Sequence, residues 1–200
     1  MRANGLRSVR RVVVKIGSRL FFESPRARAS AIAGELTALK QERGLEAVVV
    51  SSGAIALGQK ALGLVTRPHA LVHKQAIAAV GQSHLMRSWE KAFSPHGRKV
   101  GQVLITHQDV SERARFLSAR RVISTLLEYG VVPIINENDT LAVDEIKFGD
   151  NDKLAALVCN LVGADALIIL TDVDGLCDDD PKRGGRRIPL VRDIESQAIG

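Results

Sequence analysis

Short apolar runs alternate with longer amphipathic segments throughout this sequence. Five runs rich in β-branched residues predict strands, at Arg11–Ile16, Glu46–Ser51, Val100–Ile105, Val131–Ile135 and Ala166–Thr171. The runs are continuous rather than alternating, which indicates strands that are buried on both faces. Segments with helical periodicity predict helices at Arg26–Arg43, Ala70–Phe93, Ser111–Tyr129 and Asn151–Val162. Strands that alternate with helices favour an α/β fold, a three-layer αβα sandwich around a mostly parallel sheet.

Two details qualify this fold. Pro133 lies inside a predicted strand and lacks the amide hydrogen that a sheet ladder uses, so we expect that strand to lie at an edge or to be locally broken. No repeat, low-complexity tract or linker divides the chain. Residues 1–200 are therefore interpreted as one domain with no second domain.

Composition narrows the class of protein. The chain has 200 residues and 46% hydrophobic content, which suits one compact core. No segment reaches the roughly 18 consecutive apolar residues of a membrane span, and the N-terminus lacks the apolar region of a secretory signal. Cys159 and Cys177 form no CxxC pair and are interpreted as reduced thiols. We therefore expect a cytoplasmic protein with no membrane partner.

The formal net charge of +6 raises the question of nucleic-acid binding. The basic residues are scattered along the chain, and aromatic residues, which stack on bases, make up only 4% of it. A basic surface also attracts small anions such as nucleotides and carboxylates. Nucleic acid is not the partner we expect.

Polar residues follow four of the predicted strands at the point where each strand ends. The segments are Lys15–Ser18, Ser51–Ala54, Asn136–Thr140 and Thr171–Gly175. In open α/β sheets, ligands bind outside the carboxyl ends of the strands. Loops of this kind also carry glycine and asparagine for turn geometry alone. Four such strand ends together favour a binding site along one edge of the sheet.

Two segments of the chain suggest specific chemistry. Gly17 and Ser18 can offer backbone amides to an anion, and Lys15 adds a positive charge for phosphoryl oxygens, although a lysine at a strand end can also simply extend into solvent. Asp150, Asn151 and Asp152 open an apolar helix. Helix capping explains one of them, and three in a row suggest a helix N-terminus that also holds an amino acid or a metal–nucleotide ligand.

Two other signatures fail. Gly53 and Gly58 have the spacing of a P-loop, but Gln59 occupies the place of its lysine. His69 and His73 stand four residues apart without a third ligand, so we predict no protein-held metal.

Five segments together resemble one branch of a known family. They are VVVKIGS, SSGAIALG, KQAIAAVGQ, INENDTLAVDEIKFGDNDKLAAL and LTDVDGLCDDDP. They are similar to the glutamate 5-kinase branch of the amino-acid kinase family, and the resemblance runs from about Val12 to the end of the chain. It implies the substrates glutamate and ATP, the latter with Mg²⁺, and an acyl phosphate product that starts proline synthesis. It also implies a homo-oligomer, with proline as a feedback inhibitor.

The resemblance also implies roles for individual residues. Lys15 and Asp152 would be catalytic, with Asp152 holding lysines in place. The nucleotide would be bound by Lys15, Gly17, Ser18, Thr171 and Asp172. Glutamate would be bound by Ser52, Gly53, Asp139, Lys147, Asp150 and Asn151.

In this family a second catalytic lysine follows in a glycine-rich segment, often with an RNA-modification-like domain after it. Neither is found before Gly200, so we expect an amino-acid pocket that is intact and an ATP site that is only part-built. A fragment, a natural truncation and a chain completed by a partner all remain open. A catalytically inactive glutamate- or proline-binding regulatory module is the alternative function, and a related kinase acting on another acid is a third reading.

Overall fold

The computed structural model describes residues 8–18, 25–66, 68–141, 151–171, 173, 175–180 and 183–192. The chain divides into two compact units, Met1–Ile169 and Leu170–Gly200. The strands are β1 (Arg11–Ile16), β2 (Glu46–Ser51), β3 (Val100–Ile105), β4 (Val132–Glu137) and β5 (Ala166–Leu170). The helices are α2 (Pro25–Arg43), α3 (Ala54–Ala61), α4 (Leu71–Phe93), η3 (Ser94–His96), α5 (His107–Ser111), α6 (Arg113–Glu128) and α7 (Asn151–Val162).

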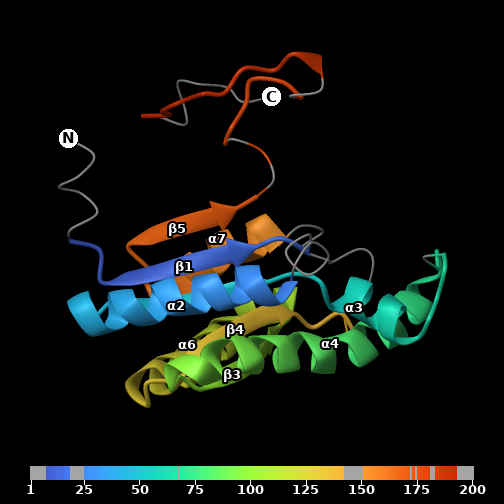
Figure 1. Cartoon of the computed structure of the whole chain (residues 1–200), viewed down its shortest axis with the longest axis horizontal. Coiled ribbons are helices and arrows are strands. Elements are labelled where there is room, and N and C mark those ends of the chain that lie inside the picture. The colour runs from blue at the N-terminus through green and yellow to red at the C-terminus, as the bar shows by residue number, and fades with distance from the viewer. Residues whose placement is uncertain are drawn as a thin grey trace. The chain divides into compact units, whose positions relative to one another are not determined.

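The five strands form one sheet in the order β3-β4-β2-β1-β5. β1 and β2, β2 and β4, and β3 and β4 pair in parallel. β5 lies beside β1 and points the same way (Figure 1). This is the parallel sheet that the alternation of strands and helices predicts.

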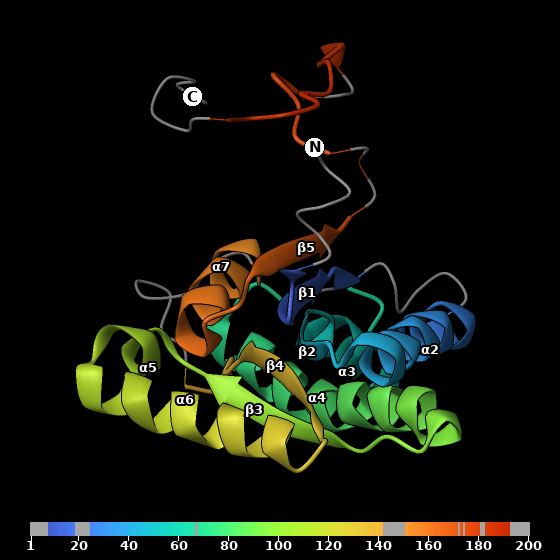
Figure 2. The same ribbon diagram turned by 90° about the vertical axis from the view of Figure 1, so that its left-hand side faces the viewer.

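Successive residues of one strand enter different halves of the core. Val12 and Val14 pack in a cluster with residues of α2 and α4, whereas Val13 packs in a second cluster with residues of α6 and α7. Figure 2 shows these two pairs of helices on opposite sides of the strands. Because neighbouring side chains of a strand point to opposite faces, a strand covered on both sides needs an unbroken apolar run. The three-layer αβα sandwich is therefore confirmed.

The prediction for the strand with Pro133 is wrong in its position. β4 lies inside the sheet, between β3 and β2. The Val132 amide donates to the Lys99 carbonyl on the β3 side at 2.9 Å, so the next nitrogen, that of Pro133, faces β2. Pairing with β2 begins only at Ile134. The missing amide hydrogen therefore falls before the β2–β4 ladder starts, and an inner strand tolerates the proline.

The helix predictions need two corrections. α3 lies in a segment for which no helix was predicted, between Ala54 and Ala61. The helix predicted at Ser111–Tyr129 is α6, which begins only at Arg113, because Glu112 has an extended backbone (φ −88°, ψ 121°) that separates it from α5, a short helix that was not predicted. α5 begins after Thr106, whose hydroxyl and amide form a capping box with Asp109. The periodicity of residues 111–129 does not show this break.

The second unit is small. Cys177 and Arg187 form an isolated antiparallel bridge, supported by a hydrogen bond from the Ile188 amide to the Leu176 carbonyl at 2.7 Å. Among the helices of the described ranges, none combines the length and the apolar character needed to cross a membrane.

Candidate functional site

A pocket of about 320 Å³ lies at the carboxyl ends of β1, β2 and β4. Parallel strands bring these ends to the same edge of the sheet, so residues from distant parts of the sequence meet there. The lining residues are Ser18, Ser52, Gly53, Ala54, Ile55, Ala56, Gln59, Asn136, Glu137, Asp139 and Asn151. Hydroxyl, amide and carboxylate groups therefore surround a space that fits a small polar molecule.

Lys15 and Asp152 form an ion pair beside this pocket. The Lys15 Nζ lies 2.6 Å from Asp152 Oδ1, and the lysine side chain is only 11% exposed. Asp152 stands in the first turn of α7, directly after Asn151 of the pocket wall. The carboxylate holds the ammonium of an inner strand at the polar edge of the sheet, because a charge this deeply buried requires a partner.

The loop after β2 is held from both sides. The Trp89 indole donates to Ser51 Oγ at 2.9 Å in the core, and the Ser52 amide donates to the Ile16 carbonyl at 3.0 Å. Gly53 then turns with φ 117°, a conformation that side chains with a Cβ rarely adopt, and α3 starts at the next residue. These contacts place Ser52 and the first amides of α3 at the pocket.

α3 is fixed by a close approach to α4. A Cβ atom on Gly58 would lie 1.9 Å from the Ile77 carbonyl oxygen, and one on Gly81 would lie 1.7 Å from that of Ala54. Glycine is required at both positions because the two backbones are nearly in contact. The position of α3 at the pocket therefore depends on these two residues.

Three amide side chains form a chain of hydrogen bonds that runs from the pocket wall to α4. Asn136 Nδ2 donates to Gln82 Oε1 at 3.0 Å, and Asn151 Nδ2 donates to Asn136 Oδ1 at 3.0 Å. Each bond uses the oxygen of one amide and the nitrogen of the next, so the orientation of Gln82 sets that of the other two. Within the described residues, the Asn151 oxygen has no hydrogen-bond partner, and it can therefore present an acceptor to a ligand.

The structure brings together many of the predicted site residues. Five of them line the pocket: Ser18, Ser52, Gly53, Asp139 and Asn151. Lys15 and Asp152 contact each other, and Gly17 directly follows β1. Thr171 belongs to the second unit and is exposed. Lys147, Asp150 and Asp172 lie outside the described residues.

Sequence reasoning gave no individual role to several residues of the site. β4 continues to Glu137 instead of ending at Ile135, so Asn136 and Glu137 are its last, buried residues. Gln82 is 9% exposed, in the middle of α4. A polar residue among apolar neighbours on a buried helix face is the signal that could have identified Gln82.

Within the part of the chain that the structure describes, no group of three or more His, Cys, Asp or Glu side chains is arranged to hold a metal ion. His69 and His73 are both exposed.

Comparison with known proteins identifies relatives of this chain. Residues 10–198 match the amino acid kinase family. A glutamate 5-kinase from Geobacter metallireducens is 50% identical over 200 residues, which cover 97% of this chain and 53% of the relative. A glutamate 5-kinase from Myxococcus xanthus is 54% identical over 200 residues, with 97% and 52% covered. The chain thus spans about half the length of the curated relatives it matches.

Two solved structures with the same fold are carbamate kinases. The carbamate kinase of Giardia matches with a TM-score of 0.58 and 17% identity, covering 90% of this chain and 79% of the other. The carbamate kinase from Giardia lamblia bound to AMP-PNP matches with a TM-score of 0.60 and 18% identity, covering 91% and 78%. At this level of identity, the likeness concerns the fold.

Proposed function

The chain belongs to the amino acid kinase family, and on that premise we propose that it transfers the γ-phosphoryl group of ATP to the side-chain carboxylate of glutamate. The product is glutamyl 5-phosphate, in the first step of proline biosynthesis. The observation that carries the proposal is the pocket with Ser52, Asp139 and Asn151, which lies beside the Lys15–Asp152 pair. Relatives named glutamate 5-kinase, about 50% identical to the chain, support it.

The pocket provides complementary groups for an amino acid. Glutamate carries one ammonium and two carboxylates at neutral pH. The Asp139 carboxylate and the Asn151 amide oxygen are acceptors for the ammonium. Ser52 and the first amides of α3 are donors for a carboxylate. The side-chain carboxylate then faces the Lys15 end of the site.

Lys15 supplies positive charge where phosphoryl transfer develops negative charge. The attacking carboxylate is already ionised, because its ordinary pKa is about 4.3, so no general base is required. Catalysis then consists of alignment and charge neutralisation. Asp152 keeps the Lys15 ammonium in one position, and Gly17 and Ser18 leave backbone amides near the phosphates. ATP enters as its Mg²⁺ complex, a substrate rather than a resident cofactor.

The decisive experiment is glutamate-dependent ADP release by this chain with Mg-ATP, with the acyl phosphate trapped by hydroxylamine. We expect a glutamyl hydroxamate that forms only when glutamate and ATP are both present. Aspartate and N-acetylglutamate serve as competing acids. Hydroxamate formed from either of them at the same rate would contradict the assignment of glutamate.

A second candidate is a glutamate- or proline-binding module without kinase activity. One observation favours it: Ser52, Asp139 and Asn151 line one pocket of the larger unit, whereas Thr171, proposed for the nucleotide, belongs to the other unit. Calorimetry separates the two functions. Glutamate binding without ADP release identifies the module, and turnover excludes it.

The remaining expectations belong to the same proposal. They are a cytoplasmic location, a homo-oligomer and feedback inhibition by proline.

A further inference from the structure

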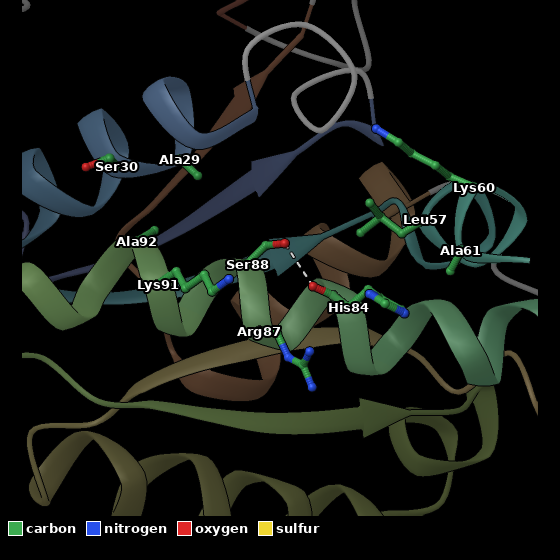
Figure 3. A pocket seen from close by; sticks show the side chains of 10 residues that line it. All are labelled: Ala29, Ser30, Leu57, Lys60, Ala61, His84, Arg87, Ser88, Lys91 and Ala92. Carbon is green, nitrogen blue, oxygen red and sulfur yellow. Dashed lines mark hydrogen bonds between the residues drawn. The ribbon is translucent and has the colours of Figure 1, made fainter.

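A second and larger cavity, of about 700 Å³, lies among α2, α3 and α4. Among the described residues, none lines both this cavity and the pocket at the sheet edge. Figure 3 shows Lys91, Ser88 and His84 in a row along α4, with Lys60 on α3. The remaining lining residues are Ala29, Ser30, Leu57, Ala61, Arg87 and Ala92.

The floor of this cavity is apolar. Ala29 is 2% exposed and Ala92 is 5% exposed, and Leu57 packs against the same core cluster. These side chains leave a surface on which a flat or aliphatic part of a ligand can lie. The volume falls within the range of about 300–1,000 Å³ that is typical of small-molecule sites.

The rim of the cavity is cationic. Lys60 and Lys91 come from different helices, and Arg87 also lines the cavity, with its guanidinium pointing away from Lys60 in Figure 3. Among the described residues, no aspartate or glutamate lines the cavity, and none of the three cations forms an ion pair. Like charges on one rim create a positive potential that an anion neutralises. The Ser30 hydroxyl is a neutral donor beside them.

We propose that this cavity is a binding site for a phosphorylated organic molecule of about nucleotide size. The phosphate lies between Lys60 and Lys91, and the organic part covers Ala29, Leu57 and Ala92. Lysine suits this role because its ammonium is a mobile point charge that binds phosphate oxygens. The site is separate from the phosphate-binding role proposed for Lys15.

α3 connects this cavity with the proposed glutamate pocket. Ala54, Ile55 and Ala56 at its start line the pocket, whereas Leu57, Lys60 and Ala61 line the cavity. The helix has only eight residues and touches α4 through Gly58. A ligand that draws Lys60 toward Lys91 therefore acts on the helix that carries the first amides of the pocket. This coupling rests on the proposed function, whereas binding in the cavity does not.

The test uses pyridoxal 5′-phosphate with the 200-residue chain. Its aldehyde condenses with a lysine amine, releasing water, and borohydride then reduces the imine to a stable secondary amine. Peptide mapping locates the modified lysine. We expect Lys60 or Lys91 to be labelled at least about tenfold faster than Lys99, an exposed lysine outside the cavity, because a bound phosphate raises the local concentration of the aldehyde. Equal labelling of Lys60, Lys91 and Lys99 would overturn the site.

Matched variants test the same site at equilibrium, without reduction. Lys60→Gln/Lys91→Gln should weaken binding of the probe at least about tenfold, as expected for the loss of two charged contacts. Arg113→Gln/Arg121→Gln removes the same net charge from exposed positions of α6 and should leave this binding unchanged. If probe binding weakens equally in both variants, the effect comes from net charge alone, which would contradict the proposal. Circular dichroism confirms that both variants fold.

Calorimetry with glutamate tests the coupling through α3. We expect the glutamate affinity to change by about fivefold or more when the probe saturates the cavity. An unchanged affinity would overturn the coupling. If glutamate fails to bind even without the probe, the proposed function fails, whereas the labelling of Lys60 and Lys91 still decides whether the cavity is a site.

Discussion

Lys15 and Asp152 are 137 positions apart in the sequence, yet their charged atoms lie 2.6 Å from each other. The lysine lies on an inner strand and the aspartate at the start of α7, so neither element alone determines the contact. Because the lysine side chain is nearly buried, the carboxylate fixes its ammonium in one place.

We expect Lys15→Ala to lower turnover by about 100-fold or more, because the transferring phosphoryl group loses its cation. Glutamate binding should change by less than about threefold, since the lysine is assigned to the phosphates. Steady-state kinetics and calorimetry measure the two effects separately, with Lys99→Ala as the control. Equal losses of turnover and of glutamate affinity would contradict the assignment.

Asp139 lines the pocket and is proposed to bind the substrate ammonium. Asp139→Ala should weaken glutamate binding by about 2 kcal/mol or more, because a charged group loses its partner. Asp139→Asn keeps the size of the side chain and removes its charge, so it should lose much of the same affinity. If calorimetry finds wild-type affinity for glutamate in both variants, Asp139 does not bind the substrate.

Gln82 orients Asn151 through Asn136. Methionine in Gln82→Met has a similar volume but no acceptor for Asn136 Nδ2, so the orientation of the Asn136 and Asn151 amides is no longer fixed. We expect about a tenfold rise in the glutamate KM, as for a hydrogen bond worth roughly 1–1.5 kcal/mol, with little change in kcat. Gln82→Glu retains an acceptor oxygen and should restore most of the affinity. If the two variants behave alike, Gln82 serves packing alone.

At the scale of elements, α3 and α4 meet through glycine. Gly81→Ala would place a Cβ atom 1.7 Å from the Ala54 carbonyl oxygen, which is part of the backbone and cannot move away without shifting α3. We expect a loss of about 1–3 kcal/mol in the free energy of unfolding, measured by urea denaturation. Glutamate affinity should fall as well, because α3 forms one wall of the pocket.

Gly34→Ala is the matched control, a helical glycine whose nearest neighbour is the His96 side chain at 3.2 Å. An exposed imidazole can move, so this variant should be neutral or slightly stabilising, as alanine favours helix. Similar losses of stability in Gly34→Ala and Gly81→Ala would show that the backbone approach of α3 and α4 is not the cause.

At the scale of the whole molecule, two aspartates link segments of the fold. Asp165 accepts hydrogen bonds from the Arg11 and Arg10 amides at 2.9 and 2.8 Å, which lowers the pKa of its carboxyl and joins the start of β5 to β1. At Asp109, burial raises the carboxyl pKa, but the hydrogen bonds from Thr106 and Arg115 outweigh it and the pKa is lowered.

A carboxyl whose pKa is lowered by folding stabilises the fold above its unfolded pKa of about 3.9. We therefore expect the stability of the chain to fall as the pH drops below that value and through the lower folded pKa values. Asp109→Asn/Asp165→Asn should be less stable at pH 7 and should lose less stability between pH 5 and pH 2. Urea denaturation across this range checks the slope. A double variant with the wild-type slope would show that other groups control acid unfolding.

The local sequence alone determined where the strands lie in the chain and which edge of the sheet carries the pocket. Continuous β-branched runs placed all five strands, because a strand covered on both faces needs apolar residues at every position. Polar residues at the ends of β1, β2 and β4 predicted the sheet edge where the pocket lies, since parallel strands end together. The binding and catalytic roles of all the predicted site residues, and the interpretation of the chain as one incomplete domain, stay predictions.

Tertiary structure alone decided which of these residues meet. The contact of Lys15 with Asp152 and the amide chain from Gln82 to Asn151 join residues that are far apart in sequence, and pairings of this kind depend on how helices pack on the sheet. The inner position of β4 likewise follows from strand order, which no local pattern specifies. The cavity among α2, α3 and α4 is the space that these three helices leave where they pack together, and no pattern within a single helix specifies it. Periodicity reports the conformation of a segment, whereas a site depends on the packing of several segments.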